Sequence, residues 1–448
     1  MGPDAGVVEV LTMVASPRRE SSSPLTVLRH RSFATFWSAA VVSDIGTWMQ
    51  SITVGVLVAQ RTGKATATGL IGVAAFATQG IGAPIGGVLA DRFDRRKMMI
   101  SALSVQLLVT LALAAVLGSS NPSVGLLTAL VAAQSLAGSF GQPAGQSLMP
   151  SLVPREELLK AVSLGAVSWN AGRIVGSALA AALGVWLSPA WVVTLNGLSF
   201  AVLIVAVASV RGTFRAPQVG ERGSFVRQLR VGGRTMWETP GCRFAVISMV
   251  FLQTTLISWV GLIPIVAQER LHGGRGLAST ITMLQGAGAL VGASFAAMLV
   301  GAIGRPRTMV FFGSLGCLAL LGYSQATNEW VAFPFVVILG CCTLSLFVCL
   351  GAVVQRDAPE HARARITSIQ SAVLGTGYGV GVFVSGRLAD RFGLGPVLAG
   401  DALLWGLVLL IAIGPLRRQW AVVGQGDPRS RRWERVLAER AATVRAAP

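Results

Sequence analysis

Three ionisable residues, Asp44, Arg173 and Asp401, lie within long apolar stretches of the sequence. A charge inside hydrocarbon is costly, so such a residue in a membrane segment is by default a functional candidate. A buried carboxyl group can take up and release a proton, whereas an arginine stays charged and needs an anion nearby. These residue types point to the movement of protons or charged molecules, and we treat all three as candidates for proton coupling.

Asp44 lies eleven residues after Phe33, which is about 16 Å along a helix that rises ~1.5 Å per residue. That depth is close to the middle of a ~30 Å hydrocarbon core. Arg173 is its best candidate partner, although Arg173 is equally suited to anchor a substrate. The alternative for Asp44 is a permanently protonated, structural acid. For Asp401, eight residues into the last apolar stretch, a locally paired structural acid is the favoured interpretation.

A second group of residues is suited to lining a cavity, because its members are polar or aromatic within apolar stretches. Thr47, Trp48 and Ser51 share a helical face with Asp44, at spacings of three, four and seven residues. Ordinary packing or anchoring at the membrane interface is the alternative for each aromatic residue. The cavity candidates are Thr47, Trp48, Ser51, Gln134, Asn170, Trp259 and Tyr378.

The composition indicates the kind of protein that must position these residues. Of 448 residues, 53% are hydrophobic and only 12% are charged, whereas soluble domains carry about 25% charged residues. Long apolar runs alternate with short polar joints, a pattern typical of a polytopic helical membrane protein rather than a transmembrane barrel. The predicted fold class is all-α, with twelve transmembrane helices. The predicted spans are 33–60, 66–90, 98–118, 124–149, 158–187, 189–210, 244–268, 276–302, 308–327, 330–355, 364–389 and 393–415.

The two halves of the sequence resemble each other at an offset of 205 residues, which pairs Arg173 with Tyr378 and Gly176 with Gly381. A six-helix unit repeated in parallel places a cavity at the interface between the halves. The predicted parts are an N-terminal segment 1–32, a first half 33–210, a linker 211–243, a second half 244–415 and an Arg-rich tail 416–448.

The basic residues predict the orientation of the chain in a membrane. Its net charge is +18, and 30 of its 37 Lys and Arg residues become cytoplasmic if the N-terminus is cytoplasmic. We therefore expect both termini and the linker inside a prokaryotic cytoplasmic membrane. Because the basic residues lie between apolar runs rather than on one domain, nucleic-acid binding is rejected. No phosphate-binding loop or metal-ligand spacing occurs, so neither a cofactor, a metal nor enzymatic activity is expected.

A short charged hairpin separates the second and third apolar stretches. The basic residues alone suffice to keep it cytoplasmic. Asp91 is not needed for that, and it can reach the positive, N-terminal end of the eleventh predicted helix. A similar stretch at 386–393 is predicted to lie on the outer side instead. The hairpin residues are Gly87, Asp91, Arg92, Arg95, Arg96 and Lys97.

This hairpin and the twelve spans in two halves resemble the major facilitator superfamily, over residues 29–415. The segments 43–50 and 90–96 resemble its transmembrane secretion effector branch, which includes enterobactin-exporter-like and macrolide-efflux-like proteins. The resemblance implies secondary transport by alternating access, with Asp91 holding the outward-facing state. Asp94 stands where the superfamily usually has glycine, and the exporter motif of the fifth span has Ser177 in place of proline.

These observations predict a monomeric, proton-coupled exporter of small amphipathic molecules such as drugs, siderophores or secondary metabolites. Its expected partners are that substrate, protons and the lipid bilayer. An importer of the same fold is the alternative within transport, and a membrane sensor or scaffold that transports nothing is the alternative outside it. The direction of flux in inverted vesicles distinguishes an exporter from an importer.

Overall fold

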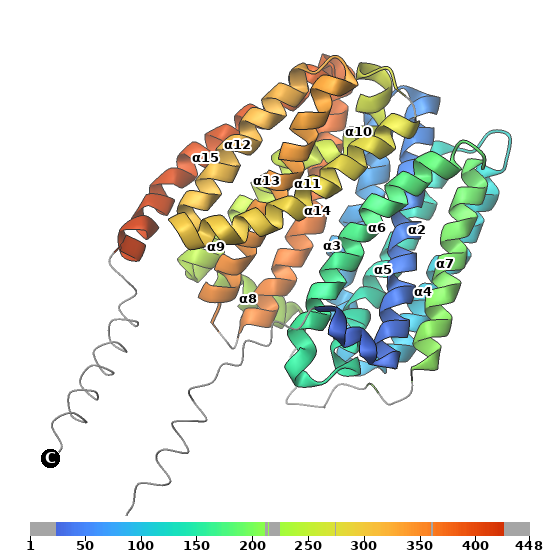
Figure 1. Cartoon of the computed structure of the whole chain (residues 1–448), viewed down its shortest axis with the longest axis horizontal. Coiled ribbons are helices and arrows are strands. Elements are labelled where there is room, and N and C mark those ends of the chain that lie inside the picture. Colours follow the sequence, from blue (N-terminus) through green and yellow to red (C-terminus); the bar gives the residue numbers. More distant parts are fainter. Residues whose placement is uncertain (1–23, 211–213, 215–224, 274, 360–361, 425–448) are drawn as a thin grey trace, which may run out of the picture.

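The computed structural model describes residues 24–210, 214, 225–273, 275–359 and 362–424, and this part of the chain contains helices and no strands. Figure 1 shows helices α2 to α7 gathered on one side and α9 to α15 on the other. Nine helices of the described residues are long and apolar enough to cross a membrane. The prediction of an all-α membrane fold is therefore confirmed, while the count of twelve spans stays a prediction.

The first half begins with the short helix η1 (Pro24–Arg29). The turns between its long helices follow local rules, since Gly63 ends α2 with φ of 58° and Asp94 caps the start of α4 through the Lys97 N–H. Its remaining helices are α2 (Arg31–Thr62), α3 (Ala65–Arg92), α4 (Arg95–Leu117), α5 (Val124–Leu148), η2 (Met149–Leu152), η3 (Arg155–Glu157), α6 (Leu158–Leu183) and α7 (Pro189–Ser209).

The second half differs from expectation at its first membrane helix, which starts at Pro240 and changes type four times. Two of its segments are π-helical, a form that often marks functional positions. The last helix also runs to Gly424, beyond the predicted span end at Pro415. The linker helix is α8 (Phe225–Glu238), and the second half comprises α9 (Pro240–Phe251), η4 (Leu252–Leu256), η5 (Ser258–Leu262), α10 (Ile263–Ile265), η6 (Val266–Arg270), α11 (Arg275–Ile303), α12 (Arg305–Gln325), α13 (Glu329–Asp357), α14 (Arg363–Phe392) and α15 (Leu394–Gly424).

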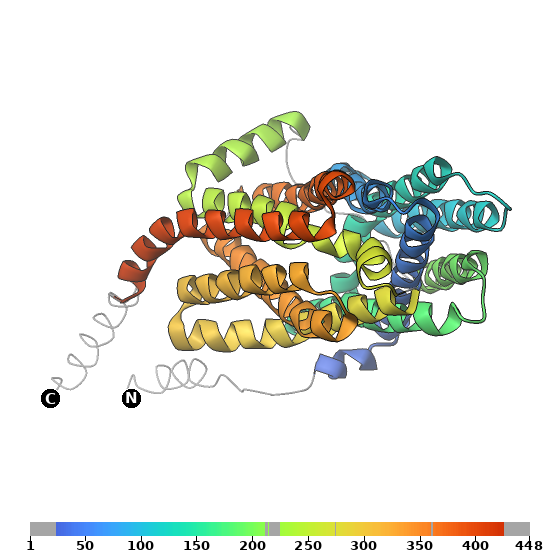
Figure 2. The same cartoon turned by 90° about the horizontal axis from the view of Figure 1, so that it is seen from above.

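Two helix pairs make the most extensive contacts between the halves, α3 with α14 and α6 with α11, and both pairs are seen in Figure 1 and again from above in Figure 2. Small residues allow the α3 and α14 backbones to touch. A Cβ at Gly375 would lie 2.7 Å from the Phe76 carbonyl oxygen, and one at Gly379 would lie 2.8 Å from Ala77 Cβ. The halves therefore meet through close backbone contact near the centre of these helices.

At one end of the bundle, where α2 ends and α3 begins, an acid of the second half caps a helix of the first. Asp390 Oδ1 accepts a hydrogen bond from the Ala65 N–H at 2.6 Å, and Oδ2 accepts one from the Thr66 N–H at 3.0 Å. Both N–H groups belong to the positive, N-terminal end of α3. At the same end a Cβ at Gly55 would lie 3.0 Å from Pro264 Cγ. The two halves are thus in contact at the end predicted to be outer.

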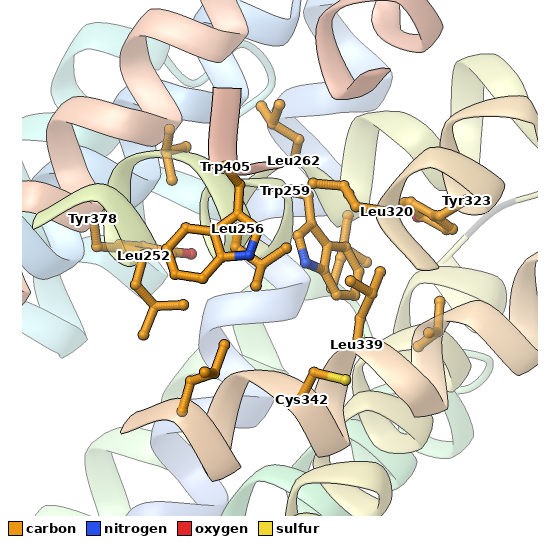
Figure 3. Packing of buried hydrophobic residues seen from close by; sticks show 14 of the residues in the cluster. Leu252, Leu256, Trp259, Leu262, Leu320, Tyr323, Leu339, Cys342, Tyr378 and Trp405 are labelled. Carbon is orange, nitrogen blue, oxygen red and sulfur yellow. The ribbon is translucent and has the colours of Figure 1, made fainter. Parts of the chain in front are cut away.

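A packed core surrounds Trp259 in the second half, as Figure 3 shows from close by, and the same cluster extends to buried residues of α2 such as Met49 and Ile52. The Trp259 and Tyr323 side chains are fully buried, with ring centres 5.1 Å apart. Trp405 Nε1 donates to the Gly313 carbonyl oxygen at 3.0 Å, which ties α15 to α12. Aromatic contacts of this kind contribute about 0.5–1.5 kcal/mol beyond the area they bury. This core fixes the scaffold that supports α14 at the interface between the halves.

At the opposite end, η1 is tied to the start of α6 by a cluster of charged groups. Glu157 accepts hydrogen bonds from Arg29 Nη2 at 2.6 Å and from the His30 ring at 2.7 Å. Val27 of η1 is fully buried beside Phe33 and α6. The hydrogen bond from His30, followed by the charge of Arg29, lowers the pKa of Glu157.

Glu157→Gln is expected to lower the thermal midpoint by a few degrees at pH 7. Because the folded-state pKa is lowered, the carboxylate stabilises the fold above the ordinary glutamate value of about 4.3 and loses that effect as pH falls through the folded value. The difference between variant and wild type should therefore vanish in acid. Thermal unfolding from pH 7 down to pH 3 measures it, with the exposed neighbour Glu156→Gln as control. A deficit independent of pH would mean that the charge is not responsible.

Candidate substrate site

A small cavity of about 70 Å³ lies inside the first half, between α2, α3, α5 and α6. Four of the predicted cavity residues, Thr47, Trp48, Ser51 and Gln134, line it. Drug-sized molecules occupy sites of about 300–1,000 Å³, so this cavity can hold only one group of such a molecule. Its full lining is Thr47, Trp48, Gln50, Ser51, Val54, Ile71, Ala75, Phe76, Val131, Gln134, Ser135 and Trp169.

A chain of buried amides forms the polar part of this lining. Asn196 Nδ2 donates to Gln50 Oε1 at 2.7 Å, and Gln50 Nε2 donates to Gln134 Oε1 at 2.6 Å. Ser199 Oγ in turn donates to Asn196 Oδ1 at 3.1 Å. Partnered networks of this kind hold their members in one orientation. Sequence reasoning found Gln134 but missed Gln50 and Asn196, whose only signal was an amide within an apolar run.

Aromatic rings connect the cavity with the interface between the halves. Trp48 and Trp169 make an edge-to-face contact with ring centres 5.4 Å apart. Phe76 of α3 makes a similar contact with Tyr378 of α14, at 4.7 Å. Tyr378, a predicted cavity residue, therefore reaches the cavity wall through Phe76 from the other half. Edge-to-face pairs are preferred geometries for aromatic rings.

Arg173 lies on α6 where it faces the second half. Its Nη1 donates to Gln285 Oε1 of α11 at 2.6 Å. Its Cζ lies 4.7 Å from the centre of the Trp48 ring, within the range of a cation–π contact. The phenol of Tyr378 lies within electrostatic range of the guanidinium. Arg173 therefore contacts both Trp48, which lines the cavity of the first half, and Gln285 of the second half.

Asp44 lies on α2, where this helix packs against α6. Its Oδ2 accepts a hydrogen bond from Ser168 Oγ at 2.6 Å. A Cβ at Gly172 would lie 2.6 Å from Asp44 Cβ, so α2 and α6 touch closely here. The expected pairing with Arg173 is not present among the described ion pairs, because Arg173 is directed to Gln285. Asp44 lies one turn of α2 before the cavity residue Trp48.

The remaining candidates are more dispersed. Asp401 Oδ2 accepts hydrogen bonds from Ser385 Oγ at 2.8 Å and Ser258 Oγ at 3.2 Å, so it ties α15 to α14 and η5. Trp259 belongs to the packed core of the second half and not to the described lining of the cavity. Asn170 is half-buried on α6, three residues before Arg173. The sequence predicts Trp259 and Asn170 as cavity residues, but neither belongs to the described lining of the cavity.

The charged hairpin joins α3 and α4 and contacts the last turn of α7 and Phe214. Asp94 Oδ2 accepts a hydrogen bond from the Phe214 N–H at 3.4 Å, and Arg96 Nη2 donates to the Ala208 carbonyl oxygen. A Cβ at Gly87 would meet nothing within 4 Å, so this glycine does not serve helix contact in this conformation. The other hairpin candidates are Arg95, half-buried, and Lys97, exposed; the side chains of Asp91 and Arg92 lie outside the described ones.

Comparison with known proteins places this arrangement in a family. Residues 22–441 match the family described as transmembrane secretion effector. Macrolide efflux protein A of Streptococcus pyogenes is 24% identical over 405 residues, covering 86% of this chain and 96% of that protein. Enterobactin exporter EntS of Escherichia coli is 24% identical over 407 residues, covering 87% of this chain and 93% of that protein.

Solved structures agree on the fold. A POT family transporter in complex with 5-aminolevulinic acid has a TM-score of 0.71 at 12% identity, covering 87% of this chain and 96% of that one. A bacterial homologue of the iron transporter ferroportin, in an inward-facing state, has a TM-score of 0.64 at 16% identity, covering 85% and 98%. The family match extends over all of the described residues. The chain belongs to the transmembrane secretion effector family of the major facilitator superfamily, and it is a multi-pass membrane transporter and not an enzyme.

Proposed function

We propose that this protein exports small amphipathic molecules from the cytoplasm by alternating access, coupled to proton entry. The observation that carries the proposal is the cavity of the first half, which combines a chain of buried amides with an aromatic wall that contacts Arg173 through Trp48. Such a mixture of apolar surface and a few oriented polar groups is typical of small-molecule sites. The names of the curated relatives, an efflux protein and an exporter, support the outward direction.

The conformation supports the alternating-access part of the proposal. The halves touch at the end where Asp390 caps α3, which the distribution of basic residues predicts to be outer. A substrate would then enter from the cytoplasmic side and leave after the halves rock about the central site. We take this structure as the inward-facing state, with both termini and α8 in the cytoplasm.

Proton coupling is assigned to Asp44. This carboxyl lies one turn from the cavity and beside the helix that carries Arg173, with a single serine as its described hydrogen-bond partner. Rocking of the halves changes the surroundings of α2 and α6, and a carboxyl that moves between drier and wetter surroundings changes its proton affinity. Proton uptake outside and release inside would then accompany export.

Flux measurements in inverted membrane vesicles test the function. The vesicle lumen is made more acidic than the outer medium, and a panel of anionic, neutral and cationic amphipathic dyes is added outside. At least one dye should accumulate in the lumen. Vesicles without the protein are the control. Movement only in the opposite direction would identify an importer, and no movement of any dye, together with no ligand-dependent stabilisation, would favour a sensor or scaffold.

A further inference from the structure

We propose that Arg173 makes the site selective for amphipathic anions, in particular for aromatic molecules that carry a carboxylate or sulfonate. This inference rests on the proposed function and narrows its substrate class. The two curated relatives do not decide this class, since the names macrolide and enterobactin refer to chemically different molecules. The substrate class is inferred instead from the charges around the cavity of this chain.

The first step is that Arg173 carries a charge which the described protein does not neutralise. The guanidinium cannot lose its proton, so its charge has to be balanced by an anion or by solvation. Its described hydrogen bond goes to Gln285, a buried and neutral amide. Its Nε is buried and has no partner among the described residues. A donor of this kind is available to an incoming acceptor.

The second step is that the two acids of the apolar stretches have other hydrogen-bond partners. Asp44 accepts a hydrogen bond from Ser168, and Asp401 accepts hydrogen bonds from Ser385 and Ser258. No ion pair among the described residues includes Arg173. In this conformation the interface between the halves therefore presents a cation that has no anionic partner among the described residues.

The third step is the position of the aromatic rings. The guanidinium lies against the Trp48 ring, and Trp48 forms the cavity wall together with Trp169 and Phe76. A ligand ring against these side chains would hold an attached acidic group close to Arg173. Benzene occupies a cavity of about 150 Å³, so entry of the ring requires this cavity of about 70 Å³ to widen. A carboxylate, or two of the three oxygens of a sulfonate, can accept two N–H donors of a guanidinium at once, and this geometry favours anions over neutral acceptors.

Three probes of one shape test the inference: 2-naphthoate, 2-naphthamide and 2-naphthylmethylammonium, titrated into purified protein by calorimetry at neutral pH. Wild type should bind naphthoate at least tenfold more tightly than the amide, since a hydrogen bond to a charged partner replaces a neutral one. It should bind the ammonium most weakly. In Arg173→Gln the preference for naphthoate should disappear while binding of the amide is retained.

Arg173→Lys, which keeps the charge, should restore part of the preference, and Arg61→Gln at the end of α2 should leave it unchanged. A wild type that binds the amide or the ammonium as tightly as naphthoate overturns the inference without any variant, as does an unchanged preference in Arg173→Gln. Flux separates this result from failure of the proposed function. Export of cationic or neutral dyes alone refutes anion selectivity but leaves the exporter, whereas absence of all flux refutes the exporter.

Discussion

Asp44→Asn is expected to lose substrate accumulation driven by a pH gradient while it keeps downhill exchange. The amide cannot carry a proton, yet its oxygen can still accept the hydrogen bond from Ser168, so the packing of α2 on α6 should persist. The loss of stability should stay below ~1 kcal/mol, the usual contribution of one such hydrogen bond. A gradient equivalent to 100 mV supplies ~2.3 kcal/mol per proton, or roughly a fiftyfold accumulation that the variant forfeits.

Flux into proteoliposomes with and without an imposed gradient measures this effect. Asp401→Asn is a matched control, because Asp401 is also a carboxyl held by serine hydroxyls in an apolar stretch. Its partners belong to α14 and η5 of the second half, whereas Asp44 lies one turn of α2 from the cavity residue Trp48. It should keep gradient-driven accumulation. Full accumulation in Asp44→Asn would remove Asp44 as the proton carrier, and loss in Asp401→Asn alone would transfer that role to Asp401.

The fold was accessible from the sequence because hydropathy and charge act over whole segments. Apolar runs of about twenty residues have no soluble alternative, and the basic joints determine their direction. The breaks in the helix after Pro240 were not accessible. Residues 252–265 carry no charge, although they include the polar residues Gln253, Thr254, Thr255 and Ser258. Hydropathy therefore predicts one continuous span and gives no sign of the π-helical and 3₁₀ turns that tertiary contacts impose. Gly261 and Pro264 were the available hints.

The site was predicted as far as single-helix geometry reaches. Spacing on one helix grouped Thr47, Trp48 and Ser51, and all three line the cavity. The partner of Asp44 depends on how two helices are rotated against each other, which the sequence does not specify. Ser168 and Arg173 are five residues apart, about 140° around α6 at ~100° per residue. The helix that presents Ser168 to Asp44 therefore has to direct Arg173 elsewhere.

The internal repeat gave information that neither half contains alone. Arg173 and Tyr378 occupy corresponding positions in the two halves, and the structure brings both side chains to the interface, within electrostatic range of each other. A repeat predicts which positions face the pseudo-symmetric centre, because the same helix of each half borders it. It does not predict the side chain at each of these positions, which is the cation Arg173 in the first half and the phenol Tyr378 in the second.

Asp390→Ala is expected to weaken the contact that closes the outer end and to shift the protein towards the outward-open state. Asp390 contributes both oxygens to the first N–H groups of α3, across the interface between the halves. Loss of a helix cap typically costs 0.5–2 kcal/mol, which corresponds to roughly a 2- to 30-fold change in the ratio of closed to open states. The cap exists only while the halves touch, so its loss raises the free energy of the closed state alone.

The measurement is the rate at which an impermeant maleimide, added outside, labels Val382→Cys in a chain whose five native cysteines are replaced. Val382 is fully buried against Gly69 and Gly72 of the other half. Asp94→Ala is the matched control, because it also removes a helix cap but one that stays within the first half. Labelling should rise only in Asp390→Ala. An equal rise in both variants would indicate general loosening, and no rise in either would mean that the backbone contacts between α3 and α14 alone keep the outer end closed.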